Sequence, residues 1–216
     1  MSGKSFASVI LDVDSTLCGV EGIDWLAAQR EPSVAVRVQE LTDRAMAGEI
    51  ALDAVYGERL ALVRPSEADV RALASEYGRQ LAPGAREAVA RLLAGGVRVV
   101  LVSGGIREAI VPVALVLGLT GADVNAVSIQ FDASGAYGGF ESDSPLARSD
   151  GKPEVAARLD LPRRVLAMGD GATDAAMRGK VDAFAAFTGF VRREAIVAQA
   201  DLVLSSFDQL AELVLG

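Results

Sequence analysis

Two aspartates near the start of the chain, Asp12 and Asp14, are spaced so that both carboxylates could act on one ligand. They follow the apolar run at residues 9–11, and in an extended strand residues two apart face the same side. A buried parallel strand is expected to be apolar throughout, and open α/β sheets bind ligands at the carboxyl ends of their strands. Taken alone, the pair is equally consistent with acidic groups at a ligand site and with an aspartate turn that closes the strand and caps the next helix.

Two later stretches could hold an anion. Ser103 and two glycines follow the apolar run 97–102 and precede a predicted helix, so backbone N–H groups and a helix N-terminus could face an oxyanion. Taken alone, this stretch is better explained by an N-capped helix after a tight loop. Lys152 is one of three lysines against eighteen arginines, which favours a role for a compact positive charge, although a solvated surface lysine is the default for such a residue.

A second pair of acids follows a third apolar run, at residues 165–168. The sequence there is Gly-Asp-Gly-Ala-Thr-Asp, with Asp170 and Asp174 four residues apart at a predicted strand-to-helix turn. Two acids with this spacing can converge on one point, and the glycines permit close approach of the backbone to a ligand. A capped turn in which Asp174 interacts with the dipole of the new helix is the alternative.

Considered together, the three strand ends predict one site. Parallel strands place their carboxyl ends on one edge of a sheet, so all four aspartates are expected to lie close together. Two carboxylates ~4 Å apart repel by about 4 kcal/mol at an effective dielectric constant near 20. A divalent cation would relieve this repulsion, and an all-oxygen ligand set suits Mg²⁺. The serine, the lysine and the backbone donors suit a phosphate group.

The composition excludes several kinds of site. The chain of 216 residues has no histidine, which excludes Ser-His-Asp and Cys-His catalysis and histidine-ligated metals. The single cysteine, Cys18, excludes an intrachain disulfide, so a metal would be held by oxygen. A formal net charge of −8 argues against a nucleic-acid partner. The longest uncharged run, at residues 109–122, is too short to span a membrane.

The alternation of apolar runs and helical periodicities predicts an α/β fold with a doubly wound (Rossmann-like) parallel sheet. Residues 19–81 show several helical periodicities and no convincing strand, which predicts a helical cap domain inserted after the first strand. The core domain would comprise residues 1–18 and 82–216, with a small β-hairpin formed by 127–131 and 136–140. No signal peptide opens the sequence, so we expect a cytoplasmic protein.

In this order, the motifs resemble those of the haloacid dehalogenase-like superfamily of phosphotransferases. Asp12-Val13-Asp14-Ser15-Thr16 matches its first motif, Ser103 the second, Lys152 the third, and the stretch 169–174 the fourth. Within the superfamily, the chain is most similar to the phosphoserine phosphatases, over nearly its whole length. Four stretches carry this closer similarity: Glu21-Gly22-Ile23-Asp24, Arg44-Ala45-Met46, Glu58-Arg59-Leu60-Ala61-Leu62 and Ser103-Gly104-Gly105.

The resemblance implies a Mg²⁺-dependent hydrolase that converts O-phosphoserine to serine and phosphate through an aspartyl phosphate, in serine biosynthesis. It implies Asp12 as nucleophile and Asp14 as the acid and then the base. The implied metal ligands are Asp12, the backbone carbonyl of Asp14, and Asp170, with Asp174 in support. The implied substrate and phosphate contacts are Glu21 (to an amino group), Met46, Arg59 (to a carboxylate), Ser103, Gly104, Lys152 and Thr173.

Some residues depart from the pattern of the phosphoserine phosphatases and bear on substrate choice. They are Trp25, Leu52, Thr173 and Phe190. Without the resemblance, Glu21 and Arg59 would be interpreted as an ordinary surface pair. The expected partner is a small phosphorylated amino acid, with no nucleic acid and no membrane, and the protein is expected to be a monomer or a homodimer.

Two other functions stay open at this point. The first is a related phosphatase or phosphotransferase for another small metabolite, such as phosphothreonine, phosphohomoserine or a phosphoamino alcohol. The second is a receiver-like phospho-acceptor module, which also uses acids, a lysine and Mg²⁺ on a doubly wound sheet. Such a module would be shorter, would lack the inserted helices, and would not carry Asp-x-Asp-x-Thr at its first strand.

Overall fold

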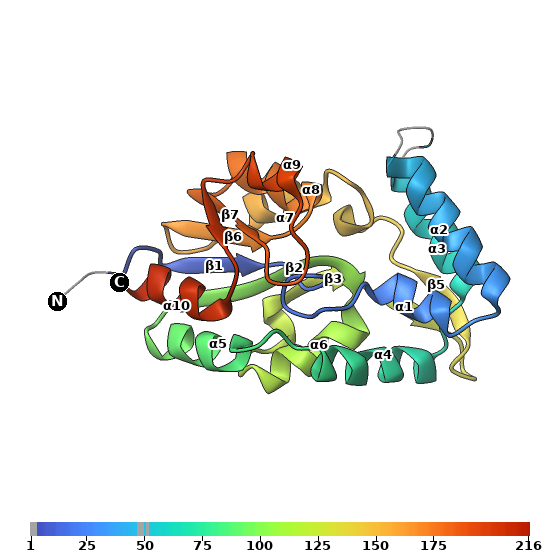
Figure 1. The fold of residues 1–216 in the computed structure, drawn as a ribbon. Helices are drawn as coiled ribbons and strands as arrows, with labels where there is room; N and C mark the ends of the chain where they lie inside the picture. The colour runs from blue at the N-terminus through green and yellow to red at the C-terminus, as the bar shows by residue number, and fades with distance from the viewer. Residues whose placement is uncertain (1–3, 47–49, 51) are drawn as a thin grey trace.

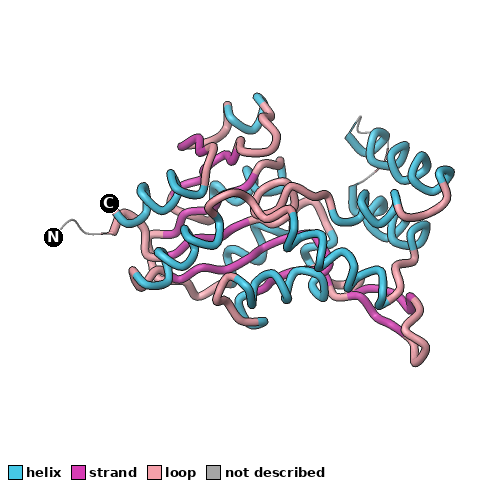
Figure 2. The backbone as a smooth tube through the Cα atoms, turned by 60° about the horizontal axis from the view of Figure 1, so that its bottom comes forward, coloured by secondary structure: helices cyan, strands magenta, loops and turns pink. Residues whose placement is uncertain are grey.

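The computed structural model describes residues 4–46, 50 and 52–216, and its centre is a six-stranded parallel sheet. The strands lie in the order β3-β2-β1-β6-β7-β8 (Figure 1). Their bounds are β1 Ser8–Leu11, β2 Arg98–Ile106, β3 Val124–Val127, β6 Val165–Gly169, β7 Ala183–Phe187 and β8 Leu202–Leu204. The antiparallel hairpin of β4 (Ile129–Phe131) and β5 (Tyr137–Phe140) stands apart from this sheet (Figure 2).

The central strands are apolar at successive positions because both faces of the sheet are covered. In β1, Val9 and Leu11 point into one hydrophobic cluster and Ile10 points into the other, and all three are fully buried. The same alternation holds in β2, β6 and β7. Two buried faces explain why these strands lack the alternating polar residues of a half-exposed sheet.

Helices on both faces make the sheet doubly wound, as the sequence predicted. One face carries α5 (Ala85–Ala94), α6 (Arg107–Val116) and α10 (Phe207–Leu215). The other face carries α7 (Gly151–Arg158), α8 (Ala172–Ala175) and α9 (Glu194–Val197) (Figure 1). Three short 3₁₀ helices, η1 (Gly121–Asp123), η2 (Pro145–Ala147) and η3 (Ala176–Gly179), connect these elements.

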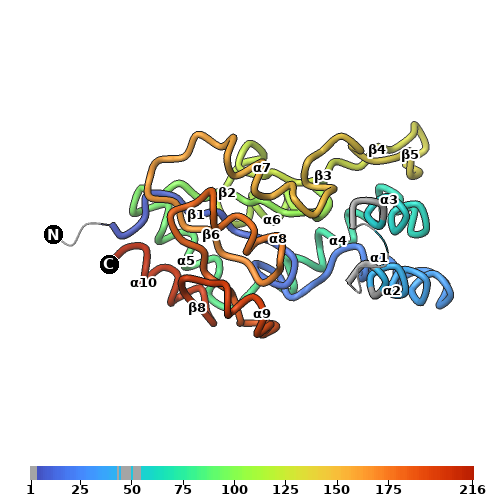
Figure 3. The backbone as a smooth tube through the Cα atoms, turned by 90° about the horizontal axis from the view of Figure 1, so that it is seen from above, coloured from blue at the N-terminus to red at the C-terminus, as the bar shows by residue number. Residues whose placement is uncertain are grey.

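In the part of the chain that the structure describes, four helices follow β1, where the sequence predicted helices. They are α1 (Gly22–Ala28), α2 (Pro32–Met46), α3 (Leu52–Val63) and α4 (Glu67–Arg79). Figures 1 and 3 show α1, α2 and α3 beyond the carboxyl ends of the strands, close to the hairpin, whereas α4 packs beside α6. None of the helices in the described ranges is long and apolar enough to cross a membrane.

The chain leaves for these helices and returns from them at one place. The Gly19 N–H donates to the Gln80 carbonyl at 2.9 Å, and the Ala82 N–H donates to the Leu17 carbonyl at 2.8 Å. An antiparallel bridge between Cys18 and Leu81 lies between these two bonds. The outgoing segment, residues 17–19, and the returning segment, residues 80–82, are therefore hydrogen-bonded to each other as a short two-stranded connection, and these two segments are called the paired crossings below.

Two local predictions were wrong. The sequence interpretation placed Ser103 in a loop after its strand, but β2 continues through Ser103 to Ile106, where Ile106 pairs with Val127 after a shift in register. The first hairpin strand was predicted at 127–131, and the separate sheet strand β3 just before it was not recognised. The two errors have different causes. The extension of β2 depends on its pairing with β3, whereas β3 was missed because Ser128 alone separates it from β4, so the two strands form one continuous β-type pattern.

One arginine holds the ends of α1, α3 and α4 together. The Arg30 Nε donates to the Val63 carbonyl at 2.8 Å, and its Nη2 donates to the Asp69 carboxylate at 2.5 Å. Asp69 also accepts the backbone N–H of Ser66, which caps α4. The hydrogen bond from Arg30 lowers the pKa of Asp69 from 3.8 to about 2. A lowered pKa means that the ionised carboxylate stabilises the folded state.

We predict that Asp69→Asn lowers the free energy of unfolding by about 1–2 kcal/mol at pH 7, because the partly exposed pair is screened by solvent. The contribution is complete above the ordinary aspartate pKa of 3.8 and is lost as the pH falls through about 2. The difference between wild type and variant should therefore shrink by about half at pH 3. Urea unfolding followed by circular dichroism at pH 7 and pH 3 measures it.

The matched control is Glu67→Gln, which removes an exposed acid from the same first turn of α4, where Glu67 pairs with Arg71 at the surface. It should change the free energy of unfolding by less than about 0.5 kcal/mol at either pH. A loss in Asp69→Asn that is the same at both pH values would contradict the charge-based explanation.

Candidate active site

The carboxyl ends of β1, β2 and β6 meet at one edge of the sheet, and the residues predicted there lie at that edge. Asp12 comes directly after β1, and its N–H donates to the Met168 carbonyl of β6 at 3.0 Å, so the strand pairing extends to it. Ser103 lies near the end of β2, and Asp170 directly follows β6. All three side chains are buried.

Lys152 lies between two of the aspartates. Its Nζ is 2.6 Å from the Asp12 Oδ1 and 2.6 Å from the Asp174 Oδ1, and its side chain is 7% exposed. Burial by itself would lower the pKa of Lys152, but the charges of Asp12 and Asp174 outweigh this and raise the pKa above its ordinary value. The lysine is therefore a permanent cation that offsets the buried acids.

Asp174 is held in place by its own turn. Its Oδ2 accepts the Gly171 N–H at 3.0 Å. Burial raises the pKa of Asp174 to about 7, and the charge of Asp12 adds to this effect, while Lys152 opposes it. A Cβ on Gly169 would lie 2.1 Å from the Asp174 Cγ, so only glycine leaves room for this carboxylate.

Asp170 is held by two residues that the sequence analysis did not identify as site residues. The Thr16 hydroxyl donates to the Asp170 Oδ1 at 3.1 Å, and the Arg193 guanidinium forms an ion pair with the same carboxylate. Arg193 lies between β7 and α9, and its side chain is 41% exposed. No sequence motif links Arg193 to Asp170. The one signal in the sequence that could have placed Arg193 near the site is its position after the apolar run that forms β7.

The acids fit the predicted Mg²⁺. One oxygen from each of Asp12, Asp170 and Asp174 lies within 4.8 Å of the other two, and all three residues are buried. A compact set of carboxylate oxygens is the donor set that Mg²⁺ prefers, and no soft ligand competes. Within the described residues, the Asp14 carboxylate is not part of this group.

The Asp14 carboxylate points to other partners. The Tyr77 hydroxyl donates to its Oδ1 at 2.5 Å, and the Gly22 N–H donates to its Oδ2 at 3.0 Å. Loss of hydration raises the pKa of Asp14 to about 7, and the negative charge of Glu21 adds to the rise. Tyr77 was not predicted, because it lies 63 residues away on α4 with no motif around it.

The predicted phosphate-binding residues lie beside the acids. The Ser103 hydroxyl accepts the Gly105 N–H at 3.0 Å, and the residue is only 1% exposed. Gly104 is half-buried, and a Cβ there would lie 3.3 Å from the Leu146 carbonyl oxygen. Thr173 is half-buried in the first turn of α8. Cys18 is buried, which raises the pKa of its thiol, so it is not a thiolate nucleophile.

The residues predicted to recognise the rest of a substrate have partners within the chain. Glu21 accepts the Ser15 hydroxyl at 2.6 Å, and Ser15 has a left-handed backbone with φ 54°. Arg59 pairs with Asp24 at 2.6 Å, while its buried Nε has no hydrogen-bond partner within the part of the chain that the structure describes. The side chains of Met46 and Leu52 lie outside the described residues.

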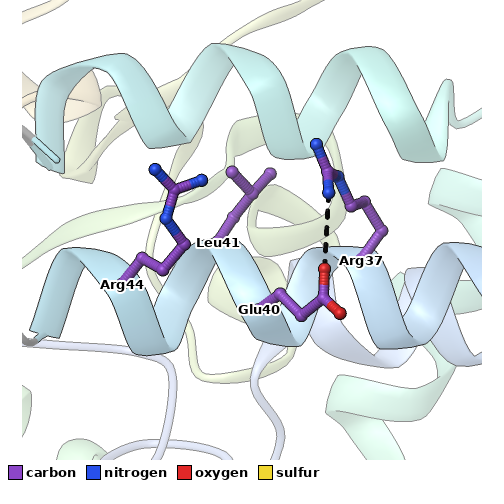
Figure 4. A pocket seen from close by; sticks show the side chains of 4 residues that line it. All are labelled: Arg37, Glu40, Leu41 and Arg44. Carbon is purple, nitrogen blue, oxygen red and sulfur yellow. Dashed lines mark hydrogen bonds and ion pairs between the residues drawn. The ribbon is translucent and has the colours of Figure 1, made fainter. Parts of the chain in front are cut away.

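A pocket elsewhere on the molecule contains none of these residues. It is lined by Arg37, Glu40, Leu41 and Arg44 of α2, and Figure 4 shows Arg37 paired with Glu40. The pair is exposed and separated by one helical turn, as is common on a solvated helix surface. The chemistry-bearing groups are gathered at the sheet edge instead.

Known proteins with similar sequences belong to the family that the motifs of this chain resemble. The family model described as haloacid dehalogenase-like hydrolase matches residues 9–178. The chain is 38% identical to the chloroplastic phosphoserine phosphatase of Arabidopsis thaliana, over 96% of this chain and 71% of that protein. It is also 38% identical to the phosphoserine phosphatase of Homo sapiens, over 94% of this chain and 91% of that protein.

A solved structure has the same fold. It is described as a phospho-aspartyl intermediate analogue of phosphoserine phosphatase, and it matches with a TM-score of 0.77 and 25% identity. The match covers 99% of this chain and 100% of the other. The motifs, the sheet topology and these matches lead to one assignment. The chain belongs to the haloacid dehalogenase-like hydrolase family.

Proposed function

We propose that this protein is a Mg²⁺-dependent phosphomonoesterase that hydrolyses O-phosphoserine to serine and phosphate. The observation that carries the proposal is the buried Asp12 carboxylate, positioned by Lys152 beside the oxygens of Asp170 and Asp174. With no histidine in the chain, a carboxylate nucleophile is the natural route for covalent phosphoryl transfer. The similarity to proteins named phosphoserine phosphatase supports the substrate.

The reaction has two steps at phosphorus. In the first, an oxygen of Asp12 forms a bond to phosphorus, the bond to the seryl oxygen breaks, and Asp14 gives its proton to that oxygen. In the second, a water oxygen attacks phosphorus, Asp14 takes a proton from the water, and the bond to Asp12 breaks. A pKa of about 7 suits Asp14 for both roles at neutral pH.

The phosphoryl group would be held by Ser103, the backbone of Gly104, and Lys152, with Thr173 nearby. Asp12, Asp170 and the Asp14 carbonyl would hold Mg²⁺, with Asp174 in support; the bound ion would neutralise charge on the transferring phosphoryl group. Lys152 also keeps the Asp12 carboxylate oriented while it is unreacted.

We also propose that residues 19–81 act as a cap domain over a core of residues 1–18 and 82–216. The paired crossings at Gly19–Gln80 and Leu17–Ala82 support this division. In the cap, Glu21 would pair with the substrate amino group and Arg59 with its carboxylate, using the Nε that has no partner among the described atoms. Met46 would close the pocket. Closure over the site would exclude water.

The setting of the protein stays a prediction as well. We infer that it works in serine biosynthesis in the cytoplasm, as a monomer or a homodimer that engages no nucleic acid. One of its relatives is named as chloroplastic. The receiver-like alternative loses its support, because the chain matches hydrolases over nearly its full length.

We predict Mg²⁺-dependent phosphate release from O-phospho-L-serine at a kcat/KM at least about 10-fold above that for phosphothreonine, phosphohomoserine or phosphoethanolamine. The first two carry one extra carbon, which is worth about 1–3 kcal/mol in a fitted pocket, and phosphoethanolamine lacks the carboxylate. A colorimetric phosphate assay with purified protein measures it, with EDTA as the control for the metal. A higher kcat/KM for another ester would contradict phosphoserine as the substrate and would identify that ester as the preferred one. Release that is insensitive to EDTA would contradict the metal role.

The nucleophile can be tested with Asp12→Asn. We predict that kcat for phosphoserine falls about 1000-fold or more, because the amide cannot form the phosphoenzyme. The control is Asp160→Asn, which neutralises an exposed acid outside the site and should leave kcat unchanged. Near-normal melting temperatures would show that both variants are folded. Turnover in Asp12→Asn within 10-fold of wild type would remove Asp12 as the nucleophile.

The carboxylate contact can be tested with Arg59→Ala. We predict a rise in KM for phosphoserine of about 10-fold or more and a change below about 3-fold for p-nitrophenyl phosphate, which has no carboxylate. Arg71→Ala is the control, because Arg71 is an exposed residue of α4 whose ion pair with Glu67 lies at the surface. Equal rises in KM for the two substrates would contradict the proposed role of Arg59.

A further inference from the structure

Tyr77 makes the shortest described hydrogen bond to Asp14 and belongs to no motif that the sequence analysis identified. Its hydroxyl donates to the Asp14 Oδ1 at 2.5 Å, and its side chain is fully buried. The other carboxylate oxygen accepts the Gly22 N–H at 3.0 Å. Each oxygen of Asp14 is thus held by one donor, which fixes rotation of the carboxylate and leaves a lone pair on each oxygen for a proton.

Gly22 makes the space for this hydroxyl, and Gly105 lies at contact distance from it. A Cβ on Gly22 would lie 2.3 Å from the Tyr77 oxygen, and a Cβ on Gly105 would lie 3.4 Å from it. Gly22 is the first residue of α1, and Gly105 lies in β2 two residues after Ser103. The Tyr77 hydroxyl is therefore fitted between Asp14 and the predicted phosphate-binding strand, at a place where a larger residue at position 22 would displace it.

We propose that Tyr77 is a positioning residue for proton transfer by Asp14. The inference rests on the proposed hydrolysis, in which the proton of Asp14 passes to the leaving oxygen as its bond to phosphorus breaks. A correctly placed acid increases the rate of bond cleavage strongly only when the leaving group must be protonated as it departs. Tyr77 therefore affects the breaking of alkyl phosphate bonds and has little effect on substrates whose leaving group departs as a stable anion.

The first test compares Tyr77→Phe with wild type on phosphoserine and on p-nitrophenyl phosphate. We expect kcat/KM for phosphoserine to fall about 10–100-fold, mainly through kcat, and kcat/KM for p-nitrophenyl phosphate to change less than about 2-fold. The parameter kcat/KM is chosen because it reports on steps up to transfer to Asp12 and not on the later hydrolysis, which the two substrates share. The control is Tyr137→Phe, in the hairpin, which should change neither value.

A role of Tyr77 in packing alone would lower kcat/KM for both substrates together, and that result would overturn the proposal. So would the absence of any change for phosphoserine in a folded Tyr77→Phe protein. If the wild type prefers another alkyl phosphate, the proposed substrate fails. The alkyl-to-aryl ratio measured with that preferred ester then still decides the role of Tyr77, so the two failures are distinguishable.

A second variant, Gly22→Ala, disturbs the same hydrogen bond between Tyr77 and Asp14 without changing either residue. Gly22→Ala would place a methyl group where the Tyr77 hydroxyl lies and should push it away from Asp14, giving a similar selective loss for alkyl phosphates. In the double variant with Tyr77→Phe, which has no hydroxyl to displace, Gly22→Ala should add less than about 2-fold. If the two losses multiply instead, the effect of position 22 does not pass through Tyr77, and the proposal fails.

Discussion

The interaction of Lys152 with Asp12 and Asp174 is the constraint on which the site depends. The topology gathers buried carboxylates at one edge of the sheet, and such a group is stable only if positive charge lies among them. Lys152 supplies that charge from the start of α7, and Arg193 supplies more at Asp170. The same arrangement leaves carboxylate oxygens grouped as a divalent ion would need them, so the charge compensation that permits folding also suits the site to such an ion.

Much of the sheet and of its acidic edge could be predicted from the sequence. Each central strand is an apolar run, and Asp12, Ser103 and Asp170 stand at or near a strand end, so the rule that parallel strands share an edge was sufficient to bring them together. The family resemblance then gave roles to residues that geometry alone would leave open. Those roles stay predictions until the variants are measured.

Other features of the site could not be predicted, because they come from pairs with no local pattern. Tyr77 meets Asp14 across 63 residues, and Arg193 meets Asp170 from the loop before a four-residue helix. The continuation of β2 through Ser103 depends on pairing with β3, which is a property of the folded sheet. Arg59 was expected to contact a substrate carboxylate, and its ion pair with Asp24 on α1 was not predicted.

The paired crossings between residues 17–19 and 80–82 have a consequence for how the chain can vary. The segment between the crossings, residues 19–81, starts and finishes at one point. Its length and sequence therefore have little effect on the position of the strands on either side of it. A different insertion with equally close ends would leave β1 in register between β2 and β6. The Asp14 carboxylate is different, since its donors, Gly22 and Tyr77, both belong to the insertion. Exchange of residues 19–81 would therefore preserve Asp12, the proposed nucleophile, and would require a new set of donors for Asp14, its proposed proton-transfer partner.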